Sequence, residues 1–287
     1  MGRTVAAGVD HYAARMTRKP PELPRRARFR RSALVALALA LPLSAAACGG
    51  GESGQAKVTD KTGATISRPA AVTTTVPANT AYTATVKTTV PKVSVYDTPT
   101  STTPSRVLDN PWQVDPDYPD ALVPQVFLVK QQRKDGWVQV LLPVRPNGSK
   151  GWVKASDVTV SPNPYHIEVS LGQHTITVSR GTQQIYQGKV AVGAPDTPTP
   201  TGEYYLRVLV KAIDPTTVYG PYAYGLSSHS DALETFAGGD AEIGIHGNND
   251  ASVLGSDVTH GCIRIDNDAI TMLSKQLPLG TPVEVTA

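Results

Sequence analysis

The sequence predicts a mostly β fold of two small domains with at least one helix. Short runs that alternate apolar and polar side chains, which are typical of half-buried strands, recur along the chain from residue 79 onwards. The 24 Gly and 24 Pro residues supply turns between such strands. A segment near the C-terminal end instead has the three-to-four-residue apolar spacing of a helix.

The first 47 residues have the three parts of an export signal. Arg25-Arg26 and Arg30-Arg31 precede an apolar run at 33–43, which is too short to span a membrane, and small residues then lead to Cys48. Two routes cut the same bond: an ordinary signal peptidase, or the lipoprotein pathway, in which Cys48 is lipidated. We favour the lipoprotein, because an unmodified Cys48 would be an exposed thiol in an oxidising compartment.

Residues 48–78 are rich in Gly, Thr, Ala and Pro and are expected to form a flexible linker. Residues 1–48 hold nine of the 27 basic and two of the 24 acidic residues, so the remaining chain has 18 basic and 22 acidic residues and a net charge of −4. The folded part therefore gives no indication of nucleic acid binding. We expect an exported protein at the outer face of the cytoplasmic membrane or in the cell wall, held by its lipid.

Residues 79–160 form the first expected β unit. Two of its strands alternate at period two, and two others begin with the same Gly-Trp-Val run. Arg145-Pro146-Asn147-Gly148 is typical of a hairpin turn, and 109–124, rich in Pro and Asp, is expected to be a loop. The strands are expected at 82–86, 92–96, 136–140 and 151–153.

This paired Gly-Trp-Val pattern around a Pro-Asn-Gly turn resembles the bacterial SH3-like barrels that are attached to cell-wall enzymes. The resemblance implies that residues 79–160 are a small β-barrel with Trp137 and Trp152 in its core. The alternative for these two indoles is stacking against a cell-wall ligand. Such a barrel would space or orient a catalytic domain.

A second unit is expected at 163–287, after the boundary Ser161-Pro162-Asn163-Pro164. Residues 212–239, with three Tyr residues and several Gly residues, exceed an ordinary connection and are expected to form a lid or binding loop. Strands of this unit are expected at 166–170, 175–179, 184–186, 189–192, 203–210, 241–246 and 283–285.

The helix of the second unit is expected to begin near Asp266 or Asn267, either of which is a good N-cap residue. It places Ile270, Leu273 and Leu277 on one face. The apolar face predicts a helix that packs against a sheet.

Cys262 is the single cysteine that follows the export signal, and it lies in Thr259-His260-Gly261-Cys262. A thiol attacks a carbonyl as a thiolate, so its pKa of about 8.5 must fall or a base must take its proton. Two histidines are candidates for the base, His260, two residues before the cysteine, and His246, sixteen residues before it. This arrangement indicates a nucleophilic cysteine.

Two glycines have expected roles beside these side chains. Gly247 could offer the carbonyl acceptor that orients His246 as a base. Gly261 allows a tight turn before the nucleophile, so that the amides of Gly261 and Cys262 could point at a developing oxyanion.

The pair His246-Gly247, followed by Thr259-His260-Gly261-Cys262, resembles the signature of the L,D-transpeptidases, and the match covers residues 163–287. Thr199-Pro200-Thr201-Gly202 and Gly220-Pro221-Tyr222 also look like family features. Arg264 stands where the family often has Asn, although a Cys-x-Arg version occurs in related enzymes. Its role is open between a contact with a substrate carboxylate and a structural ion pair.

The resemblance implies a β-sandwich-like catalytic domain that uses no cofactor and no metal. Cys262 would attack the carbonyl of the third residue of a peptidoglycan tetrapeptide stem, and the terminal D-Ala would leave. The acyl group would pass to the side-chain amine of a second stem, which gives a 3→3 cross-link. Carbapenems would acylate the same cysteine.

The resemblance also implies residue roles. His246 would be the base, oriented by the Gly247 carbonyl, and His260 would help to position the thiolate. Thr259, Tyr222, Tyr224 and Arg264 would contact the substrate, with a packing role equally open for each of the two tyrosines.

Other functions remain open from the residues alone. An L,D-carboxypeptidase would use the same site with water in place of the acceptor amine, and a non-catalytic wall-binding lipoprotein would carry a vestigial site. Cys262 could be a small buried hydrophobe, or His246, His260, Cys262 and His229 could bind zinc. His166, His174 and His229 are expected at the surface.

Overall fold

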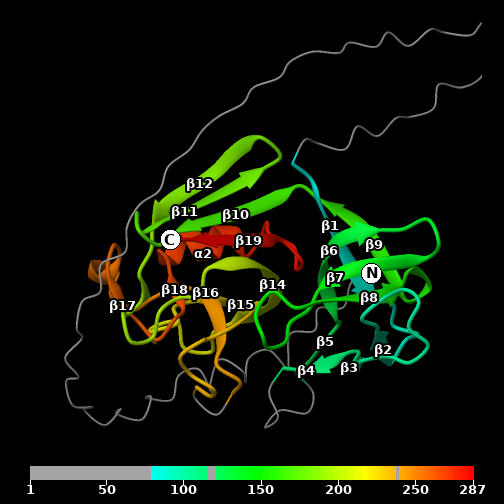
Figure 1. Ribbon diagram of the computed structural model, residues 1–287. Coiled ribbons are helices and arrows are strands. Elements are labelled where there is room, and N and C mark those ends of the chain that lie inside the picture. The colour runs from blue at the N-terminus through cyan, green and yellow to red at the C-terminus, as the bar shows by residue number, and fades with distance from the viewer. Residues whose placement is uncertain (1–78, 115–120, 237–238) are drawn as a thin grey trace, which may run out of the picture. The chain divides into compact units, whose positions relative to one another are not determined.

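The structure, a computed structural model, describes residues 79–114, 121–236 and 239–287 (Figure 1). The expected export signal, the linker at 48–78 and Cys48 lie outside the described residues. All described residues belong to one compact unit. Within them, no helix is long and apolar enough to cross a membrane.

The N-terminal part contains a five-stranded antiparallel sheet with the strand order β8-β7-β6-β1-β9 (Figure 1). Alternation along β1 buries Ala84 and Val86 against the aromatic and aliphatic side chains of β6 and β7. The predicted Pro-Asn-Gly hairpin is confirmed, since β7 pairs with β8 across it. The strands are β1 (Ala81–Val86), β6 (Val126–Gln132), β7 (Trp137–Leu141), β8 (Lys150–Lys154) and β9 (Val158–Asn163).

Two short ladders accompany this sheet. The prediction of a loop at 109–124 was wrong in part, because two strands of that segment pair with each other. Trp152 is buried as predicted, while Trp137 is only partly buried and lies edge-to-face on Tyr96 at 5.1 Å. The ladders pair β2 (Lys92–Val95) with β3 (Arg106–Asp109) and β4 (Trp112–Gln113) with β5 (Leu122–Val123), and a short 3₁₀ turn, η1 (Ala155–Asp157), precedes β9.

The C-terminal part is an eight-stranded mixed sheet of order β12-β11-β10-β19-β14-β15-β16-β18 (Figure 1). Its strands are β10 (Tyr165–Ser170), β11 (Thr175–Arg180), β12 (Gln183–Lys189), β14 (Gly202–Lys211), β15 (Tyr222–His229), β16 (Glu242–His246), β18 (Ile263–Arg264) and β19 (Pro282–Thr286). A separate parallel pair joins β13 (Val192–Gly193) to β17 (Asp257–Thr259), and η2 (Ala251–Val253) precedes the latter.

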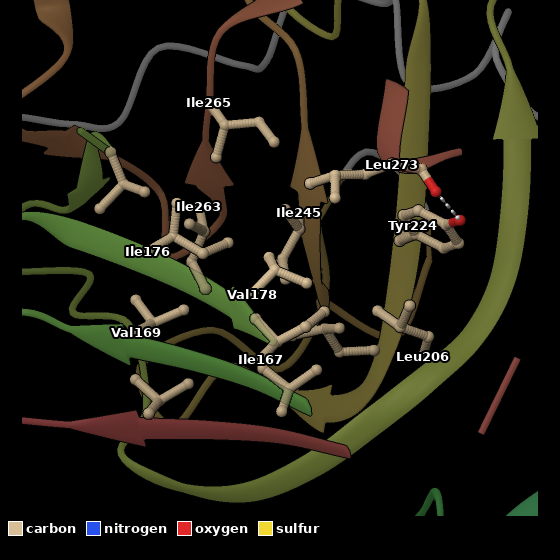
Figure 2. Packing of buried hydrophobic residues seen from close by; sticks show 14 of the residues in the cluster. Ile167, Val169, Ile176, Val178, Leu206, Tyr224, Ile245, Ile263, Ile265 and Leu273 are labelled. Atoms are coloured by element: carbon tan, nitrogen blue, oxygen red, sulfur yellow. Dashed lines mark hydrogen bonds between the residues drawn. The ribbon is translucent and has the colours of Figure 1, made fainter. Parts of the chain in front are cut away.

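The core of this part forms where alternate side chains of the strands meet helix α2 (Asn267–Leu273). Ile167 and Val169 of β10 and Ile263 of β18 are almost fully buried within it (Figure 2). Asp266 caps the helix, since its side chain accepts hydrogen bonds from the amides of Asp268 and Ala269. The predicted helix is therefore confirmed, with Ile270 and Leu273 buried on its apolar face, whereas Leu277 is buried beyond its end.

Strand β14 serves both parts of the molecule. Successive side chains of a strand point to opposite faces, and here Tyr204 lies in the C-terminal core while Tyr205 lies in the N-terminal hydrophobic cluster. Beside them, Arg207 stacks on the Trp112 ring at 3.6 Å and pairs with Glu242. The two parts therefore share a continuous interior.

The expected lid at 212–239 was wrong in part, because much of it is strand β15. This strand pairs with β14 on one side and β16 on the other, and seven of its eight residues are buried. Only the stretches on either side of β15 remain outside the sheet.

Candidate active site

The ends of three strands bring the predicted site residues together. His246 is the last residue of β16, which pairs with β15 and, in parallel, with β18. Cys262 immediately precedes β18, and Arg264 is the register partner of His246. His246, His260, Cys262 and Arg264 all line one cavity of about 190 Å³. The sequence spacing thus places the imidazole and the thiol at the same hollow.

His246 is held by its chain neighbour. Its Nδ1 lies 2.7 Å from the Gly247 carbonyl oxygen, and since a carbonyl only accepts, Nδ1 carries the proton in the neutral ring. Nε2 is then unprotonated and able to accept a proton. Burial lowers the pKa of His246 to about 4, although the Gly247 hydrogen bond raises it, and the charge of Arg264 lowers it further.

Gly247 is held in turn by the start of α2. Asn248 and Asn267 exchange hydrogen bonds, from the Asn248 amide to Asn267 Oδ1 at 2.9 Å and from Asn267 Nδ2 to the Asn248 carbonyl at 2.9 Å. A Cβ on Gly247 would lie 2.3 Å from that Oδ1 atom. Any larger residue after His246 would therefore have to displace the Asn267 side chain, and through that side chain α2 fixes the carbonyl that orients the ring.

Thr259 organises the turn that presents the thiol. Its Oγ1 donates to the Cys262 carbonyl at 2.6 Å and accepts from the Gly261 amide at 3.1 Å. The expectation that the Gly261 amide faces an oxyanion was therefore wrong, because the Thr259 hydroxyl occupies it. Gly261 has φ +115°, a conformation that strains other residues, so its predicted role in a tight turn is confirmed. The Cys262 amide remains as the candidate donor.

The Pro/Thr loop before β14 supports the same turn, which sequence reasoning missed. Thr197 Oγ1 donates to the Thr259 carbonyl at 3.0 Å, and Thr199 Oγ1 donates to the Gly261 carbonyl at 2.8 Å. Both threonines are buried. Two hydroxyls, each 62 residues upstream of its acceptor, thus fix the backbone on either side of His260. The only signal in the sequence was the family resemblance of residues 199–202, which include Thr199.

The charges at the cavity favour a neutral Cys–His pair. Burial raises the pKa of the half-buried Cys262 thiol, while a hydrogen bond with the Gly244 backbone and the charge of Arg264 lower it. Because the pKa of His246 is lowered, its ring is neutral at pH 7. The arrangement can therefore act by general base catalysis, in which the proton moves as the sulfur attacks.

Arg264 is a cation without an anionic partner in the part of the chain that the structure describes. Burial lowers its pKa, and the groups that raise it are Cys262 and Tyr219, not a carboxylate. Its buried Nε also has no hydrogen-bond partner among the described residues. Of the two roles left open by the sequence, a structural ion pair is therefore not seen among the described residues.

Tyr219 and Phe236 form aromatic walls of the cavity, which sequence reasoning did not single out. The Tyr219 ring lies 4.7 Å from the ring of His246, and the Phe236 ring lies 5.3 Å from that of His260. Burial raises the pKa of the Tyr219 hydroxyl well above its usual range, and Cys262 adds to this rise. Both residues come from the stretches that flank β15.

The two tyrosines named from the sequence do not line this cavity. Tyr224 is 2% exposed and its hydroxyl donates to the carbonyls of Leu273 and Leu277, so its role is packing against α2 (Figure 2). Tyr222 is partly buried against the same core. The tyrosine that contacts His246 is Tyr219, three residues before Tyr222.

The histidines outside the cavity have local partners. The prediction that His229 is a surface residue was wrong, since it is 1% exposed and its Nε2 lies 3.1 Å from Asp240. His174 pairs with Asp257 at 2.8 Å. Across the described ranges, no group of three or more His, Cys, Asp and Glu side chains is placed to hold a metal ion.

Comparison with known proteins gives a matching family and several relatives. Residues 164–285 match the YkuD family, described as an L,D-transpeptidase catalytic domain. YkuD of Bacillus subtilis is 34% identical over 122 residues, which cover 42% of this chain and 66% of that protein. A solved structure, Bd1075 of Bdellovibrio bacteriovorus, is 26% identical with a TM-score of 0.35, and the match covers 43% of this chain and 48% of that one. The chain thus spans about half to two thirds of these relatives' lengths.

A longer match decides the family. YkuD of Bacillus licheniformis is 30% identical over 155 residues, which cover 52% of this chain and 86% of that protein. With the match of residues 164–285 to the catalytic domain, and with the cysteine and histidine facing one cavity, the protein belongs to the YkuD family of L,D-transpeptidase catalytic domains.

Proposed function

We propose that this protein is an L,D-transpeptidase that forms 3→3 cross-links between peptidoglycan stems through a thioester on Cys262. The observation that carries the proposal is the shared cavity of Cys262 and a neutral His246 whose Nδ1 proton is held by a carbonyl. A thiol next to an imidazole that can accept a proton is the minimum that covalent acyl transfer requires.

In the first half-reaction, Nε2 of His246 takes the thiol proton as the sulfur attacks the carbonyl carbon of the third residue of a donor tetrapeptide stem. The C–N bond to the terminal D-Ala breaks, and the imidazolium returns the proton to the departing amine. The products are free D-Ala and a thioester. The Cys262 amide is the candidate donor to the oxyanion.

In the second half-reaction, the side-chain amine of an acceptor stem attacks the thioester. His246 takes a proton from the attacking nitrogen and gives it to the leaving sulfur, so the thiol is restored and one amide bond links two stems. His260, at the rim with Phe236, helps to position the sulfur. Arg264 binds a carboxylate of the stem, since a buried guanidinium favours such an anion.

The same nucleophile makes carbapenems expected inhibitors, because the strained carbonyl of a β-lactam acylates a thiolate. Lipidation of Cys48 and the linker at 48–78 would place the catalytic part at the outer face of the cytoplasmic membrane, within reach of the wall. In this proposal, residues 79–160 are an SH3-like unit and 163–287 are the catalytic domain.

The test is mass spectrometry of the protein, without its anchor, mixed with a purified disaccharide-tetrapeptide. We expect a dimer that lacks one D-Ala with the wild type and none with Cys262→Ala. His246→Ala should nearly abolish the product, whereas the matched control His174→Ala, at a histidine outside the cavity, should leave it. A tripeptide without dimer would instead indicate the L,D-carboxypeptidase, and full activity of Cys262→Ala would rule out the mechanism.

A further inference from the structure

The hairpin turn of the N-terminal part contacts a segment at residues 230–236 and 239–240. Leu233 and Phe236 of this segment line the catalytic cavity. Arg145, in this turn, donates to three backbone carbonyls of that segment: to Ser230 at 2.6 Å, to Leu233 at 3.0 Å and to Asp240 at 3.1 Å. Its guanidinium also lies 3.6 Å from the Asp240 carboxylate. One side chain therefore holds both ends and the middle of a segment 85 to 95 residues away in sequence.

Asn147 of the same turn extends the end of strand β15. Its Nδ2 donates to the His229 carbonyl at 2.7 Å, and its Oδ1 accepts from the His229 amide at 2.9 Å. A side-chain amide here replaces the two hydrogen bonds of a neighbouring strand. Asn147 also donates to the Asp231 carboxylate at 3.1 Å, so it fixes the point where the chain leaves the sheet.

The segment held in this way carries two walls of the cavity. Arg145 holds the backbone carbonyl of Leu233, and the Leu233 side chain lines the cavity with Phe236. The Phe236 ring in turn contacts the ring of His260. A continuous set of contacts therefore runs from Arg145 through Leu233 and Phe236 to the residue two before the nucleophile.

The segment has little else to fix it. Within the described residues, its other hydrogen bonds lie near its two ends. The Ser230 amide donates to the Ala241 carbonyl at 2.9 Å, Ser230 Oγ accepts from the amides of Ala232 and Leu233, and Phe236 and Gly239 form a bridge, while the Asp240 carboxylate also lies 3.1 Å from His229 Nε2. Hydrogen bonds from a guanidinium are roughly twice as strong as neutral ones. Losing three of them at once should let the segment sample other conformations.

We propose that Arg145 and Asn147 are positioning residues for substrate binding, so that the N-terminal part shapes the cavity that receives the donor stem. They act through Leu233 and Phe236 and do not touch the reacting atoms. This inference rests on the proposed function for the identity of the substrate. It assigns the N-terminal part a share in the site beyond that of a spacer.

Steady-state kinetics of the full chain with tetrapeptide donor test the inference, with Cys262 titrated to count active sites. We expect Arg145→Ala and Asn147→Ala to raise KM for the donor about tenfold and to leave kcat per titrated cysteine within about twofold, because the chemistry at Cys262 and His246 is intact. Arg145→Lys, which can satisfy fewer carbonyls, should give an intermediate KM. Arg133→Ala, the same change in a local pair with Asp135 of the N-terminal part, should match the wild type.

Hydrogen exchange of the amides of residues 231–236 supplies a readout that does not depend on any substrate. Exchange should be about tenfold faster in Arg145→Ala than in the wild type and unchanged in Arg133→Ala. Unchanged exchange, or a lower melting temperature with an unaltered KM, would overturn the positioning role. If the wild type fails to act on tetrapeptide, the proposed function falls, while faster exchange would still support the positioning of the segment.

Discussion

The Nδ1 atom of His246 lies 2.7 Å from the carbonyl oxygen of Gly247, the next residue in the chain. Many catalytic histidines are oriented by a carboxylate from a distant segment, but here the acceptor is a neutral backbone group. Burial lowers the pKa of His246 to about 4, and the neutral acceptor raises it less than a carboxylate would. The choice of acceptor therefore affects the pH at which the base works.

The first prediction concerns activity against pH. His246 accepts a proton only when it is neutral. The rate of acylation of Cys262 should therefore fall on acidification near the pKa of about 4 and not near pH 6.5. The rate constant for acylation by a carbapenem, measured by mass spectrometry from pH 8 downward, checks this. Circular dichroism at each pH verifies that the fold persists. An acid limb centred near the ordinary value would contradict a buried, neutral base.

Stability should depend on pH through the same residue. The pKa of His246 is about 4 in the folded protein and near 6.5 in the unfolded chain, so between these values the unfolded chain binds the extra proton. The free energy of unfolding should therefore fall as pH is lowered through this window, by up to about 3 kcal/mol from this group. Urea unfolding at both ends of the window measures it.

His246→Gln is the comparison for this second prediction, since glutamine does not titrate. The variant should lose less stability on acidification than the wild type, and His229, whose pKa is also lowered by burial, contributes equally to both. An identical pH dependence of the two proteins would show that His246 is not responsible.

The third prediction concerns the turn that presents the thiol. Thr259→Val keeps the side-chain shape and leaves the Gly261 amide and the Cys262 carbonyl without their partner. The free energy of unfolding should fall by about 1–3 kcal/mol, and acylation should slow about tenfold because the Cys262 backbone is no longer fixed. Thr271→Val is the control, since the Thr271 hydroxyl makes only a local bond to Asn267 within α2. Equal acylation rates in the two variants would contradict the idea that the Thr259 hydroxyl holds Cys262 in position.

Some strands of the fold could be predicted from the sequence, and others could not. Alternating β1 and β2 were found, but β6 was missed because Val126 to Leu128 is a continuous apolar run buried on both faces. In β9, Pro162 suggested a boundary, yet proline is accepted in a strand at a position that needs no amide donor. Strand β15, rich in Gly, Ser and Tyr, is recognisable only from its two neighbours.

The site was predictable where the residues are adjacent in sequence. Cys262, His260 and Thr259 form one motif, and His246 lies close upstream. Thr197 and Tyr219 reach the site through tertiary structure, and neither residue type alone signals such a role. The oxyanion assignment of the Gly261 amide failed for a related reason, since the backbone direction depends on which hydroxyl the turn encloses.

The fourth prediction is that Tyr219 affects catalysis whereas Tyr224 affects only stability. Tyr219→Ala should uncover the His246 ring, move the acid limb of acylation upward from about 4, and lower kcat/KM about tenfold. Tyr224→Phe should only lower the free energy of unfolding, by about 1 kcal/mol, since its hydroxyl bonds the end of α2. A large kinetic effect of Tyr224→Phe, with no change in stability, would reverse these roles.

Because Tyr204 and Tyr205 lie in different hydrophobic clusters, truncation of the chain between its two parts should expose one of them. A fragment that began at residue 163 would keep β14 but expose the Tyr205 ring, which is fully buried in the intact chain. Exposed apolar surface of this kind promotes aggregation. Melting should then occur in one step for the intact protein, and truncated forms made for inhibitor screening should carry the N-terminal strands with them.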